Sequence, residues 1–225
     1  MLAGFAGGAL YFLAENTALQ ITQASNVALL ACTTPIFTIF FSRLFFKNKG
    51  AAEIKGKRIR LATLLALAGV LLVTLNGRFI LQINPLGDLL SLLAAFAWAV
   101  YIILLKSLGE RYSMLFITRK VFFYGLLTIL PMFLHTPLNF NSFVLMQPII
   151  FGNLLYLGLV ASLLCYFLWN VVVKRLGAVR ASGYVYLSPV VTMATAVIVL
   201  NETITLMAAA GAVFILAGVA LAERG

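Results

Sequence analysis

Eight apolar segments, each about twenty residues long, follow one another along this 225-residue chain. They lie at roughly residues 2–21, 25–46, 60–77, 86–106, 115–134, 148–173, 180–200 and 205–222. A helix needs about 20 predominantly apolar residues to cross the hydrocarbon core of a bilayer, whereas a barrel strand needs about half as many. Only helices and closed barrels satisfy every backbone polar group in lipid. The pattern therefore predicts an all-α integral membrane protein with eight transmembrane helices.

The composition excludes a soluble domain and changes the meaning of the net charge. Hydrophobic residues make up 63% of the chain and charged residues 10%, whereas soluble domains have about 45–50% and about 25%. A net charge of +10 would suggest nucleic acid in a soluble protein. In a membrane protein it reflects the enrichment of Lys and Arg in cytoplasmic loops. The expected partner is the lipid bilayer, and no nucleic acid is expected.

The basic residues lie in alternate connections between the segments. The connections "KNKGAAEIKGKRIR", "KSLGERYSM" and "KRLGAVR" are basic, whereas "TQAS", "HTPLNFNSFVLMQ" and "NETIT" contain no Lys or Arg. With eight helices, 15 of the 16 basic residues fall on one side and only Arg78 on the other. This asymmetry predicts a multi-pass protein of the plasma or inner membrane with both termini in the cytoplasm, loop 47–60 inside and loop 135–147 outside.

Several landmarks occur twice in the same order. Pro35 and Pro189 are 154 positions apart, as are Asn16 and Asn170, and "LAGV" at 67–70 returns 149 positions later. The second copy of each segment runs in the opposite direction through the membrane, an arrangement typical of secondary transporters. We therefore expect two inverted repeats.

The two repeats have unequal lengths in this chain. Residues 1–80 provide the last three helices of the first repeat, and residues 85–225 provide all five helices of the second. On this alignment about 68 residues, enough for two helices, would precede Met1.

Three stretches carry a resemblance to a known family. "GDLLSLLAAFAWAVYIILLK" (87–106), "ASGYVYLSPVVTMATAVIVLNE" (181–202) and "AAAGAVFILAGVALA" resemble the EamA-domain branch of the drug/metabolite transporter superfamily. The first half departs from the pattern, because Asn48 stands where Glu202 stands in the second half. The resemblance implies a ten-helix fold of two inverted five-helix repeats, of which this chain is an N-terminally shortened version. It also implies export or exchange of small organic solutes.

Polar and aromatic residues inside the apolar segments are the candidates for a substrate cavity. They are Glu15, Asn16, Thr17, Trp98, Tyr101, Tyr166, Trp169, Asn170, Tyr184 and Ser188. Pro35 and Pro189 are expected to kink their helices and to free backbone carbonyls toward the cavity. The alternative for the aromatic residues is ordinary packing, and for Asn170 a hydrogen bond that only holds helices together. No catalytic cluster, metal-ligand spacing or cofactor motif is present in the sequence.

Glu15 is the candidate for coupling transport to a proton gradient. A carboxylate costs about 2.5–3.5 kcal/mol at the centre of a membrane helix by insertion scales, so such residues usually face a cavity. The sequence places no basic residue near its depth. We expect Glu15 to bind a proton in one state and release it in another, with Asn16 and Thr17 as neighbours. The alternative is a carboxylate reached by water from the outer mouth, or one paired with a residue on helices before Met1.

These observations predict a secondary transporter that exports or exchanges amino acids, metabolites or drugs, coupled to protons or to another gradient. The alternative is a truncated protein of the same type that inserts but does not transport on its own. A membrane-embedded enzyme ranks third, because no group of nucleophile, base or metal ligands is visible. The sequence does not decide whether the protein forms a homodimer.

Overall fold

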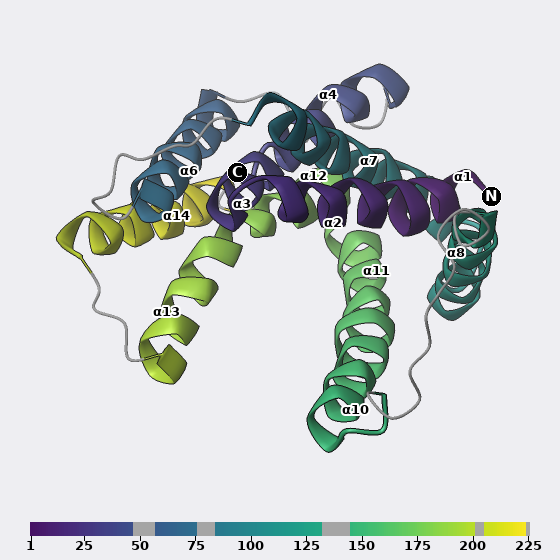
Figure 1. Ribbon diagram of the computed structural model, residues 1–225. Helices are drawn as coiled ribbons and strands as arrows, with labels where there is room; N and C mark the ends of the chain where they lie inside the picture. Colours follow the sequence, from purple (N-terminus) through teal and green to yellow (C-terminus); the bar gives the residue numbers. More distant parts are fainter. Residues whose placement is uncertain (47–56, 76–83, 132–144, 201–204, 224–225) are drawn as a thin grey trace.

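The computed structural model describes residues 1–46, 57–75, 84–131, 145–200 and 205–223 (Figure 1). Within these ranges the chain is helical and has no strand, which confirms the all-α fold class. Most of loop 47–60 and of loop 135–147 lies outside the described residues, together with Asn48, Arg78 and Glu202.

The helices follow the apolar segments closely. The first half contains α1 (Leu2–Gly4), η1 (Phe5–Leu10), α2 (Tyr11–Ile21), α3 (Ala24–Ala31), α4 (Thr34–Phe45) and α6 (Lys57–Leu75). The second half contains α7 (Pro85–Gly109), α8 (Met114–Ile129), α10 (Pro148–Leu155), η3 (Tyr156–Leu164), α11 (Cys165–Leu176), α12 (Ala178–Gly183), η4 (Tyr184–Leu187), α13 (Ser188–Leu200) and α14 (Leu206–Glu223).

Three of the described helical stretches are long and apolar enough to cross a membrane: Asn26–Phe45, Pro85–Gly109 and Pro148–Leu176. Two shorter apolar helices cover Ile59–Thr74 and Leu206–Ala222. A count of eight transmembrane helices therefore stays a prediction.

Both prolines singled out in the sequence lie at interruptions of a helix rather than within a smooth kink. Helix α3 ends at Ala31, and α4 begins at Thr34 with Pro35 in its first turn. Likewise the 3₁₀ turn η4 precedes α13, whose second residue is Pro189. Proline has no N–H and clashes with the carbonyl four residues earlier, so the preceding turn cannot continue as an α-helix.

Helix α7 lies at the centre of one packing unit. It contacts α2, α3, α4 and η1, and its buried face includes Tyr101, Ile102 and Leu105. Asn84 caps its first turn by accepting a hydrogen bond from the Gly87 N–H. This helix therefore sets the positions of the first-half helices relative to the second half.

Helices α6 and α14 cross in direct backbone contact, as their adjacent ribbons show (Figure 1). A Cβ added to Gly69 would lie 2.5 Å from the carbonyl oxygen of Gly211. A Cβ added to Gly218 would lie 2.7 Å from the carbonyl oxygen of Ala62. Small residues allow helices to approach this closely.

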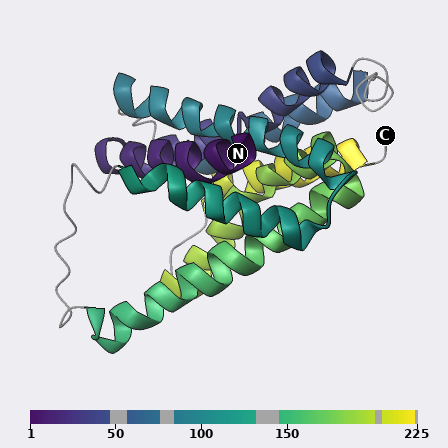
Figure 2. The same ribbon diagram turned by 90° about the vertical axis from the view of Figure 1, so that its right-hand side faces the viewer.

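The rod formed by α10, η3 and α11 extends away from the other helices, as two perpendicular views show (Figures 1 and 2). Neither α10 nor η3 has a buried residue, and apolar side chains such as Ile149, Phe151 and Leu159 are exposed. Buried residues begin only in α11. This rod therefore joins the rest of the protein through its C-terminal part.

Candidate functional site

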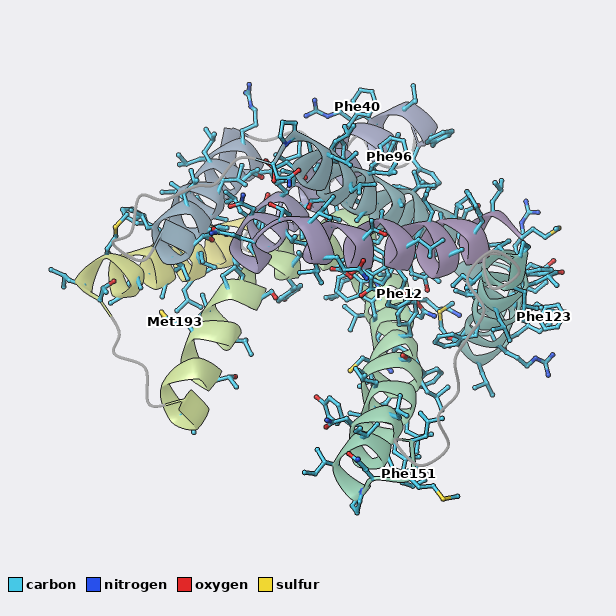
Figure 3. All side chains as sticks on the ribbon, in the orientation of Figure 1. Phe12, Phe40, Phe96, Phe123, Phe151 and Met193 are labelled. Atoms are coloured by element: carbon cyan, nitrogen blue, oxygen red, sulfur yellow. The ribbon has the colours of Figure 1, made fainter. Side chains whose placement is uncertain are left out.

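An aromatic cluster forms where α2, α7 and α11 meet. The Trp98 ring lies 4.7 Å from that of Tyr11, 5.4 Å from that of Tyr166 and 6.0 Å from that of Trp169, measured between centroids. In Figure 3 Phe12 is labelled near the top of α11, and its ring stacks on that of Tyr166. The cluster consists of Tyr11, Phe12, Trp98, Tyr101, Phe122, Tyr166 and Trp169.

A buried chain of hydrogen bonds ties this cluster to α8. The Tyr101 hydroxyl donates to Asn170 Oδ1 over 2.6 Å, and Asn170 Nδ2 donates to Thr118 Oγ1 over 2.7 Å. Thr118 in turn donates to the Met114 carbonyl. Asn170 and Tyr101 are both 0% exposed. The amide of Asn170 thus links three helices at a point where water cannot compete.

The wide turns of η1 provide a second polar contact. The Tyr166 hydroxyl donates to the Gly7 carbonyl over 2.6 Å. Gly7 lies in a π-helical segment, and such segments are frequent at functional sites. A Cβ at Gly7 would lie 2.5 Å from Cγ of Tyr101, so only glycine allows this approach of η1 to α7.

Glu15 lies one helical turn after Tyr11, at the edge of the aromatic cluster. Its side chain is half-buried and lies near that of Tyr11. No basic side chain among the described residues forms an ion pair with it. A partly exposed carboxylate without an ion-pair partner can exchange a proton, whereas a carboxylate in an ion pair would be held ionised.

One donor of the cluster has no acceptor. The indole Nε1–H of Trp169 is buried and has no hydrogen-bond partner among the described residues. Buried polar groups normally have a partner, because an unpaired one keeps its desolvation cost. This N–H is therefore available to an acceptor atom of a bound solute.

Other candidates lie away from the cluster. Asn16 and Thr17 are exposed, because each residue turns an α-helix by about 100° and rotates them off the face that carries Tyr11 and Glu15. Ser188 is exposed at the start of α13, and Tyr184 lines a separate hollow.

The structure thus brings six of the ten candidates together. They are Glu15, Trp98, Tyr101, Tyr166, Trp169 and Asn170. Sequence reasoning missed Tyr11 and Thr118. The spacing of four residues between Tyr11 and Glu15 could have indicated the first, but no signal in the sequence pairs Thr118 with Asn170.

Replacing Asn170 with Leu should lower the melting temperature by roughly 3–8 °C, a loss of about 1–2 kcal/mol. The hydroxyls of Tyr101 and Thr118 would lose their partner in a buried place. Thermal unfolding in detergent measures this. Asn153→Leu is the control, because Asn153 is exposed on α10. Equal melting temperatures for the two variants would contradict the structural importance of the network.

The cluster brings together aromatic rings, a half-buried carboxylate and one unpaired donor. Among the described residues no group of three or more His, Cys, Asp or Glu side chains could hold a metal ion. Apolar helices of this length indicate an integral membrane protein, and the similarity to a known family identifies its class as membrane transporters. The model of the EamA-like transporter family matches residues 1–75 and 85–223. The chain belongs to the EamA-like transporter family.

Individual relatives agree with this assignment. An uncharacterized transporter of Archaeoglobus fulgidus is 29% identical over 217 residues, which cover 96% of this chain and 72% of the relative. A probable amino-acid metabolite efflux pump of Salmonella typhimurium is 35% identical over 163 residues, covering 68% and 54%. A solved crystal structure is similar with a TM-score of 0.75 at 19% identity, over 99% of this chain and 75% of the other, and this shows a shared fold.

Proposed function

We propose that this protein is a secondary transporter that exports or exchanges small organic solutes, amino acids and related metabolites among them, in exchange for protons. The observation that carries the proposal is Glu15, which lies beside Tyr11 and the aromatic cluster and has no basic partner among the described residues. Aromatic rings suit the apolar part of a solute, and the N–H of Trp169 suits an acceptor atom. The name of the Salmonella relative, probable amino-acid metabolite efflux pump, supports the same solute class.

Flux through reconstituted protein tests this function. Proteoliposomes would be loaded with a panel of radiolabelled amino acids and organic acids, and release would be followed with and without an imposed proton gradient. We expect gradient-dependent release of at least one solute above that of protein-free liposomes. Correctly inserted protein without any flux would favour the alternative, a shortened transporter that inserts but does not transport on its own.

We also propose that residues 1–80 and 85–225 are inverted repeats, the first represented by three helices. The contact of Gly69 with Gly211 supports this, because adding 149 to one number and subtracting it from the other gives the contact of Gly218 with Ala62. The two π-helical segments are related in the same way: residues 5–10 fall on 159–164 of η3 at the offset of 154.

The two asparagines fit this arrangement despite their different exposure. Asn170 finds its partners on α7 and α8, the first two helices of its own repeat. Asn16, the counterpart of Asn170, is exposed and forms no such hydrogen bonds among the described residues.

We propose that both termini face the cytoplasm, and labelling of single cysteines tests it. A cysteine at Lys55 should resist a membrane-impermeant maleimide in intact cells and react after permeabilisation, whereas one at Asn141 should react from outside. The basic asymmetry motivates this, with 15 of 16 Lys and Arg on one side. In support, Lys106 at one end of α7 lies 4.9 Å from the ring of Phe46 at the basic end of α4. External labelling at Lys55→Cys would refute the assignment.

A further inference from the structure

A hollow lies between α4, α6, α12, η4 and α14, apart from the aromatic cluster. About 50 Å³ of space lies within the hollow itself, or about 650 Å³ when the open space at its mouth is included, and small or apolar residues such as Pro35, Ile39, Ala66 and Gly218 form most of its lining. We propose that this hollow binds a small organic anion with an apolar body. We expect the ligand to enter from the cytoplasm, and only this part of the proposal rests on the proposed function.

The shape of the hollow follows from the crossing of α6 and α14. The residues that allow the two backbones to touch, Ala62, Ala66 and Gly218, also present little side chain toward α4. An apolar lining with a few polar groups is typical of sites for small molecules. The apolar lining would therefore hold the body of the ligand.

The charge of the lining indicates which polar group the ligand carries. Among the described residues that line the hollow, Arg180 is the only charged one and no carboxylate is present. Its side chain is exposed at α12 and forms no ion pair within the described residues. A guanidinium matches a carboxylate with two parallel hydrogen bonds, whereas it repels an amine. The hollow therefore favours an anion over a cation.

A buried hydroxyl adds an independent sign of a ligand. Tyr186 lines the hollow, is 4% exposed, and its hydroxyl has no hydrogen-bond partner within the described part of the chain. The hydroxyls of Thr63 and Tyr184 belong to residues of the same lining. A polar ligand atom would satisfy the Tyr186 hydroxyl, which otherwise keeps its desolvation cost.

Binding of phenylacetate to the purified protein tests the proposal. The protein would be placed in nanodiscs of phosphatidylcholine, and binding of radiolabelled phenylacetate would be compared with that of neutral phenylacetamide and cationic phenethylamine. We expect phenylacetate to bind most tightly. Arg180→Gln should weaken phenylacetate at least tenfold and leave phenylacetamide unchanged, while Tyr186→Phe should weaken both severalfold.

Arg175→Gln is the matched control, since Arg175 is an exposed arginine of α11 outside the hollow. It should change phenylacetate binding less than twofold. A second set of nanodiscs with phosphatidylglycerol separates two sources of the anion. Competition would identify an anionic lipid headgroup as the ligand, and its absence would identify a solute from water; both outcomes support an anion site.

Three results would overturn the proposal: phenethylamine binding as tightly as phenylacetate, Arg180→Gln behaving like Arg175→Gln, or no binding by well-folded protein. The assay measures no flux, so it fails independently of the transport assay. Binding without flux would overturn the proposed transport and leave the site, whereas flux without binding would remove the site alone.

Discussion

Replacing Glu15 with Gln should abolish the pH dependence of transport while leaving the fold intact. The amide has the shape and polarity of the carboxylic acid, but it cannot take up or release a proton. We expect flux driven by a proton gradient to fall at least tenfold, to the level measured without a gradient. Proteoliposomes with an internal pH dye and a radiolabelled solute report both quantities together.

The control for this prediction is Glu110→Gln. Glu110 is exposed at the C-terminal end of α7, far along that helix from Trp98 and the aromatic cluster, so its loss should leave the pH profile unchanged. Tyr11→Phe should shift the profile without abolishing it, because the proton-binding group remains. If Glu15→Gln transports with the wild-type pH profile, Glu15 is not the coupling site.

Replacing Gly69 with Leu should prevent α6 and α14 from packing and should have the largest effect on stability of any change considered. Even a single Cβ would lie 2.5 Å from the Gly211 carbonyl oxygen, and that oxygen is part of a helix backbone that cannot rotate away. Overpacking commonly costs about 1–3 kcal/mol and more where the backbone must move. We expect about 3 kcal/mol or more, seen as loss of monodisperse protein in size-exclusion chromatography.

Gly158→Leu is the control, because nothing lies within 4 Å of a Cβ added there. It introduces the same side chain on the exposed segment η3 and should leave yield and melting temperature nearly unchanged. Gly218→Leu should behave like Gly69→Leu, since it opposes Ala62 across the same crossing. Tolerance of Leu at both Gly69 and Gly218 would contradict the packing of α6 on α14.

The positions of the helices could be read from the sequence, because the length and hydropathy of a segment depend on nearby residues alone. Which helices pack against each other could not be predicted in this way. The repeated "LAGV" marked Gly69 and Gly218 as equivalent, but nothing in it indicated that each faces the other half of the chain across one crossing. That information lies in surface shape, which periodicity does not encode.

In the candidate site, too, the sequence indicated which residues stand out but not which of them contact one another. Asn170 and Tyr101 stood out as polar groups in apolar segments, and they share a hydrogen bond. Asn16 and Thr17 stood out equally, yet they lie on the exposed side of α2. A polar residue in an apolar segment demands a partner or a cavity, but the direction of its side chain depends on which helix face packs.

The rod formed by α10, η3 and α11 is attached through α11, so it would move like a lever about that attachment. Its buried residues are Tyr166, Asn170 and Val173, which lie along one seam, while α10 and η3 have none. At the α-helical rise of 1.5 Å per residue, Pro148 stands at most about 27 Å from Tyr166. A tilt of 10° about the seam would carry that far end through an arc of up to about 5 Å. A small repacking around Asn170 would thus become a much larger displacement at the far end of the rod.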